Sequence, residues 1–426
     1  MLKQLEGSRA VAEAVAMCRP EVICAYPISP QTHIVEALGA MVKKGDQAAE
    51  FLNVESEFAA MSVAIGASAA GARAYTATAS QGLLYMSEAV YNAAGLGLPI
   101  VMTVANRAIG APINIWNDHS DSMSQRDAGW LQLFAETNQE ALDLHIQAFR
   151  IAEELSIPVM VCMDGFLLTH ASERVDIPEP GQVDAFLPPY EPRQVLDPAD
   201  PVSIGAMVGP EAFTEVRYLA FERMRQSLDT IAATAADFAA QFGRPSGGLV
   251  RPYQIDDAET IVVALGSVLG TVKDTVDELR AEGMRVGALG ITAYRPFPAD
   301  AIREALGTSS TPRGDDPPRH RHVVVLERAV APGTGGIVTA DIRMALADRM
   351  APHLSTVIAG LGGRAVTKKS LRGLLLAAGE LPPLSFLDLD TGLVDRELAR
   401  MRTTRRSGPS PENMLRDLGI TASRIG

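Results

Sequence analysis

Residues 53–71 read Asn-Val-Glu-Ser-Glu-Phe-Ala-Ala-Met-Ser-Val-Ala-Ile-Gly-Ala-Ser-Ala-Ala-Gly, a polar start followed by small and apolar side chains. The pattern predicts a helix that packs closely against a neighbouring element, with Glu57 in its first turn. Burial disfavours the charged form of a carboxyl, so a carboxyl in an apolar place can share a proton with a ring nitrogen. The positive end of the helix macrodipole also favours acids in a first turn, so the stretch by itself leaves both interpretations open.

Short apolar runs on either side of this helix predict buried strands that alternate with helices. The strands are expected at residues 22–26, 51–54, 72–78, 98–105 and 157–163, and the helices at 9–19, 32–43, 83–94 and 141–154. This alternation indicates a parallel sheet covered on both faces, in which ligands bind at the carboxyl ends of the strands. The segments that directly follow a strand are 27–30, 55–57, 80–82 and 106–107.

The pattern changes after the fourth strand. Residues 107–137 form a long irregular stretch, and a loop of this length in a compact domain is usually functional. Residues 174–203 are rich in Pro and Asp and predict a connecting arm. Residues 212–242 have one long helical pattern, which is expected to bridge to a neighbouring domain or to form its outer layer.

Alternation restarts at Glu259 and predicts a second, smaller α/β domain. Its strands are expected at 261–265, 285–291, 322–326 and 355–359, with a helix over 271–282. Residues 308–321 are polar and proline-rich and predict a solvated insertion. The basic tail after Arg400 is expected to be irregular, and either mobile or bound to a partner.

Composition bounds the class of function. The chain has 426 residues, 47% of them hydrophobic and 21% charged, which is typical of a globular protein with two or three domains. A formal net charge of −13 argues against a nucleic-acid or anionic-membrane surface, because both need clustered Lys and Arg. The sequence contains no secretory signal and no run of about 20 apolar residues that predicts a spanning helix.

Cysteine usage argues against metal clusters on this chain. The three cysteines are isolated, without C-x-x-C spacing, so they predict neither an iron–sulfur cluster nor a structural zinc site. Such sparse thiols fit a reducing cytoplasm. His119 lies near Asp118 and Asp121, but this polar turn lacks a second histidine, and we expect no metal site.

Phosphate-binding motifs are missing. Residues 333–338 resemble G-x-G-x-x-G but fail at the last position, and no P-loop sequence is present. The turns at 266–267 and 360–363 are interpreted as ordinary connections between strands and helices. Arg107 follows a strand and can bind a carboxylate through a two-pronged hydrogen bond, although a surface salt bridge would explain it equally well.

Five motifs, taken together and in order, resemble the alpha subunit of the pyruvate:ferredoxin oxidoreductases. They are residues 26–30 (Tyr-Pro-Ile-Ser-Pro), 53–57 (Asn-Val-Glu-Ser-Glu), 66–73 (Gly-Ala-Ser-Ala-Ala-Gly-Ala-Arg), 79–83 (Ala-Ser-Gln-Gly-Leu) and 105–107 (Ala-Asn-Arg). Segments 111–118, 163–170, 265–267, 294–297 and 360–364 extend the resemblance, which covers the chain from about residue 5 to about residue 380.

The resemblance implies an α/β fold with two parallel-sheet domains. Residues 1–240 would be a pyrimidine-binding-type thiamine diphosphate domain that includes the connecting arm and the long helix. Residues 250–395 would be a smaller, transketolase C-terminal-like domain, and residues 396–426 a tail.

The resemblance also implies an activity and its partners. Such enzymes oxidatively decarboxylate a 2-oxo acid with thiamine diphosphate, form an acyl-coenzyme A and pass electrons through 4Fe-4S clusters to ferredoxin. A beta subunit would supply the diphosphate and Mg²⁺ half of the thiamine site, and gamma and ferredoxin-like delta subunits, or fusions of them, would complete the complex. The family's Gly-Asp-Gly metal motif and its cluster cysteines are missing here, so the chain is expected to be half a site.

By position, Glu57 matches the family's glutamate that hydrogen-bonds the aminopyrimidine ring and so promotes deprotonation of the thiazolium carbon. Glu55 lies two residues away and cannot share a helix face with Glu57. Phe58 departs from the polar residue that relatives often carry there.

Substrate contacts are implied in the same way. Arg107 matches the arginine that holds the substrate carboxylate, and Ser29 stands where relatives often have threonine, with its hydroxyl toward the substrate. Pro27, Ser80 and Gln81 are further candidate contacts to the cofactor.

The sequence leaves the substrate open. Pyruvate is expected, with 2-oxoglutarate or a branched 2-oxo acid as the nearest variant. The pocket volume around Ile28, Ile109 and the loop to Asp121 would decide between them, and the sequence does not give that volume. A second alternative is a scaffold subunit that binds its partner without turning over, and retention of both Glu57 and Arg107 argues against it.

Overall fold

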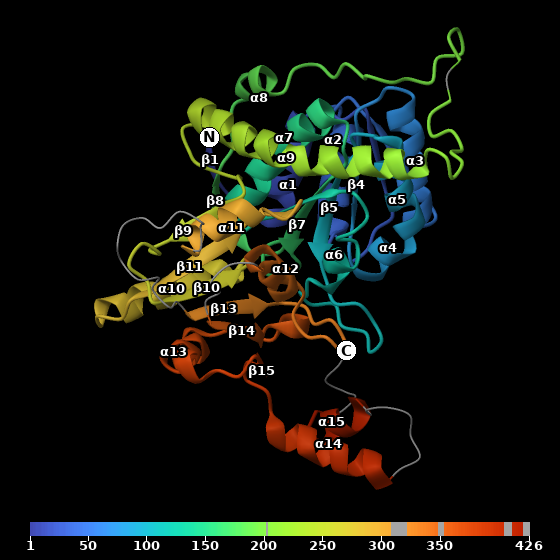
Figure 1. Cartoon of the computed structure of the whole chain (residues 1–426). Coiled ribbons are helices and arrows are strands. Elements are labelled where there is room, and N and C mark those ends of the chain that lie inside the picture. The colour runs from blue at the N-terminus through green and yellow to red at the C-terminus, as the bar shows by residue number, and fades with distance from the viewer. Residues whose placement is uncertain (202, 308–321, 348–352, 404–410, 421–426) are drawn as a thin grey trace.

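The computed structural model describes the chain except for residues 202, 308–321, 348–352, 404–410 and 421–426. The expected solvated insertion at 308–321 therefore lies outside the described residues. Two sheets, each flanked by helices, make up the body of the molecule (Figure 1).

The first half of the chain contains these elements: β1 (Leu2–Glu6), α1 (Gly7–Met17), β2 (Val22–Ala25), α2 (Thr32–Lys44), β3 (Glu50–Asn53), α3 (Glu57–Ala69), β4 (Ala74–Thr78), α4 (Ser80–Tyr85), α5 (Ser87–Leu96), β5 (Val101–Asn106), α6 (Ser120–Ser124), β6 (Leu131–Phe134), α7 (Asn138–Leu155), β7 (Val159–Asp164), β8 (Ser172–Asp176), α8 (Pro180–Phe186) and α9 (Phe213–Phe242).

The second half contains β9 (Val250–Tyr253), β10 (Thr260–Ala264), α10 (Val268–Ala281), β11 (Val286–Ile291), β12 (Ala293–Arg295), α11 (Ala299–Ala305), β13 (His322–Glu327), α12 (Ile337–Leu346), β14 (His353–Ile358), α13 (Lys368–Leu376), β15 (Leu384–Phe386), α14 (Thr391–Thr403) and α15 (Pro411–Asp417).

The first sheet has the strand order β12-β6-β7-β5-β4-β2-β3, and its strands are parallel except for β12. Strands β4, β5, β6 and β7 are buried along their whole length, which confirms the parallel sheet covered on both faces. Helices α1, α2 and α7 cover one face, and α3 and α5 cover the other. The carboxyl ends of β2, β3, β4, β5 and β7 therefore meet at one edge.

Two strands of this sheet were not predicted. Strand β6 lies inside the expected long loop, where its four residues give little periodicity. Strand β12 comes from the second half of the chain and pairs antiparallel with β6, and Phe134 N–H donates to Thr292 O at 2.8 Å beside this pairing. The expected helix at 83–94 is interrupted at Met86, between α4 and α5.

The second sheet has the order β15-β14-β13-β10-β11-β9, with β9 antiparallel. One face packs on α10 and α13 in a core of its own. The other face, with Ile302 of α11 and Ile342 of α12, belongs to the apolar cluster that contains Met61 of α3 and Trp130. The two domains therefore share a hydrophobic core, and burial of that core fixes how they sit together.

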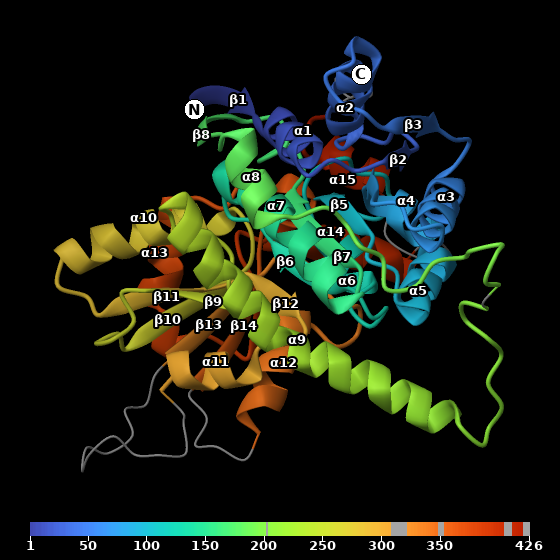
Figure 2. The same cartoon turned by 90° about the horizontal axis from the view of Figure 1, so that it is seen from above.

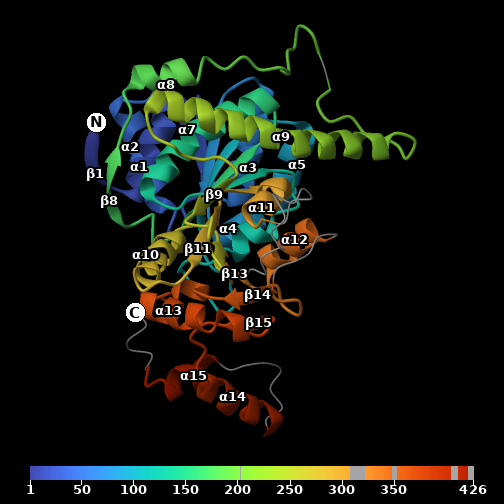
Figure 3. The ribbon, with the colours of Figure 1, turned by 60° about the vertical axis from the view of Figure 1, so that its left-hand side comes forward.

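The predicted connecting arm contains regular structure. Strand β8 pairs antiparallel with β1, whose polar sequence gave no strand signal, and α8 follows. Helix α9 forms over the predicted range. Its second half packs on α7 through Ile231 and Phe238, while its first half extends beyond the body and exposes Phe213 and Phe221 (Figures 2 and 3).

The expectation of an irregular tail is wrong for its described residues. Helices α14 and α15 contact each other below the second sheet in Figure 1, and Arg400 Nη2 donates to Asp417 Oδ1 at 2.9 Å. Arg396 Nε also pairs with Asp417 Oδ2 at 3.2 Å, so two arginines of α14 hold one carboxylate of α15. Of the helices in the described part of the chain, none has both the length and the apolar character needed to cross a membrane.

Candidate functional site

The loops at the carboxyl edge of the first sheet come together as the strand-end rule predicts. Helix α3 begins there because Ser56 caps it: the Ser56 side chain accepts the N–H of Ala59 at 3.2 Å. Glu57 is then the first helical residue, and only 8% of it is exposed. Glu55 precedes the cap and is exposed. The cap thus turns Glu57 inward and leaves Glu55 in solvent.

The carboxylate of Glu57 lies against the start of α4. A Cβ at Gly82 would stand 2.7 Å from Glu57 Oε1 and 2.6 Å from Thr78 Oγ1, so only glycine fits between them. The Thr78 hydroxyl is buried and has no hydrogen-bond partner. Within the described part of the chain, no donor to the Glu57 carboxylate is present either. Two polar groups therefore face each other across Gly82 with unused hydrogen-bonding capacity.

Ser80 and Gln81 lie beside this pair. Ser80 is fully buried with φ of +51°, a conformation that ordinary residues rarely adopt. Its hydroxyl hydrogen-bonds to Ala108 O at 2.5 Å and to the Gln81 side chain. Gln81 is half-buried and approaches Gly110 so closely that a Cβ there would lie 2.7 Å from Gln81 Nε2. The loops after β4 and β5 are thus joined.

Asp121 organises this junction, and sequence reasoning missed it. Its fully buried carboxylate accepts four hydrogen bonds, from the backbone N–H groups of Ser80 and Arg107 at 2.9 Å, from Asn106 Nδ2 at 2.8 Å and from Ser122 N–H at 2.7 Å. Burial raises the pKa of Asp121, and these hydrogen bonds act against that rise. The residue lies in the polar turn around His119, and its partners are up to 41 residues away in the chain.

Arg107 is buried, with 6% of the residue exposed. Its Nη1 donates to Ser29 O at 2.8 Å and its Nε to Asn114 O at 3.4 Å. Burial lowers the pKa of Arg107, and the charge of Asp121 acts in the opposite direction. The alternative interpretation of the sequence, in which Arg107 forms a surface salt bridge, is therefore wrong. The guanidinium is held by backbone carbonyls and forms no ion pair with a described carboxylate, so it can still pair with a bound anion.

The outer rim of the site is open and partly aromatic. Ser29 and Pro27 are exposed. Phe58 and Tyr85 are 39% and 62% exposed, and their rings pack with centroids 6.5 Å apart. Phe58 therefore faces outward beside Glu57. The rim of the site thus leaves two aromatic rings in solvent.

A buried ionic cluster attaches the second domain to this edge. Asp164, at the end of β7, contacts His119 Nε2 at 2.7 Å, Arg328 Nη1 at 2.9 Å and the N–H of Ser267 at 2.9 Å, and it also bonds the Ser267 hydroxyl. Burial raises the pKa of Asp164, but the charges of Arg328 and His119 outweigh burial and hold this pKa well below its usual range. His119 is thus part of this cluster and contacts the Asp164 carboxylate at the end of β7.

The loop after Arg107 also reaches the second domain directly. Asn114 Nδ2 donates to Gly362 O at 3.2 Å, and Gly363 N–H donates to Asn117 O at 2.8 Å. The turn at 360–363, which the sequence analysis interpreted as an ordinary connection, therefore supports the loop that follows Arg107.

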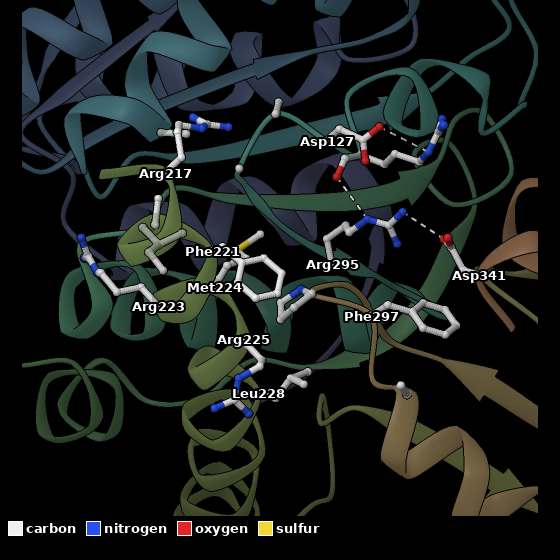
Figure 4. Close-up of a pocket in the computed structure, with 18 of the residues that line it drawn as sticks. Asp127, Arg217, Phe221, Arg223, Met224, Arg225, Leu228, Arg295, Phe297 and Asp341 are labelled. Carbon is white, nitrogen blue, oxygen red and sulfur yellow. Dashed lines mark hydrogen bonds and ion pairs between the residues drawn. The ribbon is translucent and has the colours of Figure 1, made fainter. Parts of the chain in front are cut away.

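A separate cavity of about 710 Å³ opens at the opposite, amino-terminal edge of the sheet (Figure 4). It lies between α5, α9 and the segment after β12, and Gly95 and Ser156 contribute to its wall. Arg295 points into it and pairs with Asp341 at 2.9 Å. None of the candidate residues Ser29, Pro27, Glu57, Ser80, Gln81 and Arg107 lines this cavity. The predicted site therefore lies at the carboxyl edge of the first sheet and not in this cavity.

Two family models match the chain. The family described as "Pyruvate flavodoxin/ferredoxin oxidoreductase, thiamine diP-bdg" matches residues 13–235, and "Pyruvate:ferredoxin oxidoreductase core domain II" matches residues 258–371. The chain belongs to the pyruvate:ferredoxin oxidoreductase family. The family resemblance drawn from the motifs is thereby confirmed.

Several curated members of this family are similar over most of the chain. Pyruvate synthase subunit PorA of Methanosarcina barkeri is 47% identical over 372 residues, which cover 86% of this chain and 90% of that protein. The protein of the same name from Thermotoga maritima is 43% identical over 86% of this chain and 91% of its own length. Ketoisovalerate oxidoreductase subunit VorA of Pyrococcus abyssi is 37% identical over 93% of this chain and 96% of its own length.

Solved structures share the fold. A 2-oxoglutarate:ferredoxin oxidoreductase from Magnetococcus marinus matches with a TM-score of 0.66 at 17% identity, over 88% of this chain and 65% of that chain. A split gene transketolase matches with a TM-score of 0.52 at 13% identity, over 89% of this chain and 99% of that chain. The predicted α/β fold class, with a thiamine diphosphate domain followed by a transketolase-like second domain, is confirmed. The domain bounds at 240, 250 and 395 stay a prediction, and α14 crosses the last of them.

Proposed function

We propose that this chain is the alpha subunit of a pyruvate:ferredoxin oxidoreductase and that Glu57 and Arg107 carry its share of the chemistry. The reaction oxidises pyruvate and coenzyme A to acetyl-coenzyme A and CO₂, releases a proton and passes an electron pair to ferredoxin; the same site also serves the reverse direction. The observation that carries the proposal is the buried Glu57 carboxylate without a described donor, placed at the carboxyl edge of a thiamine-binding family domain.

The residues around Glu57 fit the aminopyrimidine ring of thiamine diphosphate. Glu57 and the Thr78 hydroxyl are buried polar groups with unused hydrogen-bonding capacity, and Gly82 leaves the approach to both free of a side chain. Ser80 and Gln81 directly precede Gly82, and the exposed Pro27 lies in the loop after β2 at the same edge of the sheet. Bound there, thiamine diphosphate would supply the carbon nucleophile that attacks the keto group of the substrate. Glu57 would share a proton with the ring nitrogen and hold it in place.

Arg107 and Ser29 would bind the 2-oxo acid. A guanidinium held by two backbone carbonyls is fixed in orientation and can offer its remaining N–H groups to the substrate carboxylate. The exposed Ser29 would present its hydroxyl to the same substrate. Fixing the carboxylate aligns the bond that breaks when CO₂ leaves.

The site requires a partner subunit. The chain lacks the Gly-Asp-Gly sequence for Mg²⁺ and the cysteines for a cluster, and the aromatic rim of Phe58 and Tyr85 is left in solvent. We infer that a beta subunit covers this rim and supplies the diphosphate and Mg²⁺ half of the site. In this proposal that subunit and the gamma and delta subunits carry the 4Fe-4S clusters that reduce ferredoxin.

The test of the function is a dye-reduction assay on the natively purified complex. Pyruvate-dependent reduction that requires coenzyme A is expected, with weaker reduction by 2-oxoisovalerate and 2-oxoglutarate, since the 47% and 43% identical relatives are pyruvate synthase subunits and the ketoisovalerate relative is 37% identical. Faster turnover of 2-oxoisovalerate or 2-oxoglutarate would overturn the assignment of pyruvate as the substrate. Failure of all three acids in a complex that contains clusters would support the scaffold alternative.

Arg107→Ala is expected to raise the KM for pyruvate by about 10–100-fold, the scale of a lost hydrogen bond to a charged group. Arg107→Lys keeps the positive charge but lacks the planar, two-pronged guanidinium, so it should recover only part of the lost affinity for pyruvate. Dye-reduction kinetics of the complex measure both variants. Arg372→Ala, which removes an exposed arginine of α13, is the control and should leave KM unchanged. An unchanged KM in Arg107→Ala would refute the carboxylate contact.

A further inference from the structure

Three side chains with metal-binding groups converge near the start of α2, the helix that follows the predicted substrate loop in the chain. Glu6 ends β1, His33 lies in the first turn of α2, and His170 lies in the connection from β7 to β8. Their ligand atoms all lie within 4.8 Å of one another, and this is the one such group of three among the described residues. Residues 6, 33 and 170 are brought together only by the fold.

Two contacts describe the spacing within this cluster. His33 Nδ1 stands 2.6 Å from Glu6 Oε1, and the two imidazole rings lie with centroids 4.5 Å apart. Ligands about 2.0–2.2 Å from a tetrahedral ion stand a little over 3 Å apart. An ion could therefore bind between Glu6 and His33 after a small outward shift of either side chain.

The surroundings hold His170 in position. Its Nδ1 contacts Thr169 Oγ1 at 2.7 Å, and that oxygen can accept the Nδ1–H, which leaves Nε2 as the metal-binding atom. Phe166 packs on the His170 ring at 4.6 Å between centroids, and Trp116 packs on Phe166 at 4.7 Å. A metal-binding histidine ordinarily has such a hydrogen-bond partner on its second nitrogen.

We propose that Glu6, His33 and His170 form a binding site for a divalent transition-metal ion, Zn²⁺ in particular. Two imidazole nitrogens and one carboxylate are a ligand set that zinc accepts, whereas Mg²⁺ and Ca²⁺ prefer oxygen ligands alone. Glu6 and His33 are partly exposed, so water can fill the fourth position and the ion can enter from solvent. This site is separate from the Mg²⁺ that we assign to the beta subunit, and it does not depend on the proposed function.

Zinc at this position would tie three segments together. His33 lies three residues after Pro30, so the ion would connect the start of α2, directly behind the loop of Ser29, to β1 and to the β7–β8 connection. The cysteines do not compete for the ion, because Cys18, Cys24 and Cys162 are buried and burial raises their pKa values, that of Cys24 to about 12.

The experiment uses the full chain without a histidine tag, freed of metal by a chelator and titrated with Zn²⁺ and with Co²⁺. We expect one ion per chain by elemental analysis after gel filtration, and the visible absorption bands of tetrahedral Co²⁺. His33→Ala and His170→Ala should each weaken binding by more than the roughly 10–100-fold that loss of an outer-shell partner costs. Because His33 lies at the surface, its variant should fold normally, as circular dichroism can check.

His353→Ala is the matched control. The rings of His353 and His322 also lie close together, with centroids 5.6 Å apart. Among the described residues, however, these two histidines do not form a metal-binding group with a carboxylate. This variant should bind the ion as the unchanged chain does, and zinc should raise the melting temperature of both but not of His33→Ala. The proposal is overturned if the unchanged chain takes up no ion, if His33→Ala and His170→Ala bind it equally well, or if Co²⁺ shows only octahedral bands.

Discussion

Glu57→Gln is expected to lower pyruvate-dependent turnover of the assembled enzyme by about two to four orders of magnitude, the usual scale for a lost proton-transfer group. Glutamine keeps the size of the side chain and its place against Gly82, but it cannot share a carboxyl proton with a ring nitrogen. Because the geometry is preserved, the chain should still assemble with its partners. Turnover of the natively purified complex, measured by dye reduction at saturating pyruvate and coenzyme A, tests this.

Glu55→Gln is the matched control. Glu55 is the same residue type two positions earlier, in front of the helix cap and in solvent, so its change should leave turnover within about twofold, as for surface substitutions of small energetic effect. Equal loss in both variants would indicate a general effect of charge near the start of α3. Full activity of Glu57→Gln would remove Glu57 from the proposed site.

Asp164→Ala is expected to lower the free energy of unfolding by about 3–5 kcal/mol, because it leaves the Arg328 guanidinium buried without its counter-charge and His119 without its hydrogen-bond partner. The variant should also impair turnover, since the same cluster fixes the loop between Arg107 and the second domain. Urea unfolding followed by circular dichroism measures the stability. Asp127→Ala, at an exposed aspartate 3.7 Å from Arg126, should change stability little.

The ionic cluster also predicts how stability depends on pH. The pKa of Asp164 in the folded chain is held below its value in the unfolded chain, which is about 4. Its contribution to stability is therefore fully present above that value and is lost as pH falls toward the folded-state pKa. The stability difference between the unchanged chain and Asp164→Ala should accordingly be constant near neutral pH and shrink in acid. A difference that grows in acid would contradict this assignment.

Much of the first domain can be predicted from the sequence because its strands are short, continuous apolar runs. Strands β2, β3, β4, β5 and β7 all form within a few residues of the predicted ranges, and the strand-end rule then selects the loops that the structure brings to one edge. The same rule applied to β7 would have selected Asp164, the residue directly after the predicted strand. Strands β1 and β8 were missed because they are polar and pair only with each other.

The residues that organise the site could not be predicted, because their partners are distant in the chain. Asp121 reads as part of a polar turn, and only folding shows that its carboxylate binds the backbone of Ser80 and Arg107. Strand β12 extends the first sheet from the second half of the chain, a pairing with no local signal.

The α/β alternation and the choice of Glu57 and Arg107 as candidates follow from the order of the amino acids, because periodicity and strand ends are local properties. The tertiary structure alone decided which carboxylate is buried, what holds the arginine and how the second domain braces its loop. Burial and ion pairing depend on groups that are far apart in the chain, such as Asp164 and Arg328, and only the packed core brings them into contact.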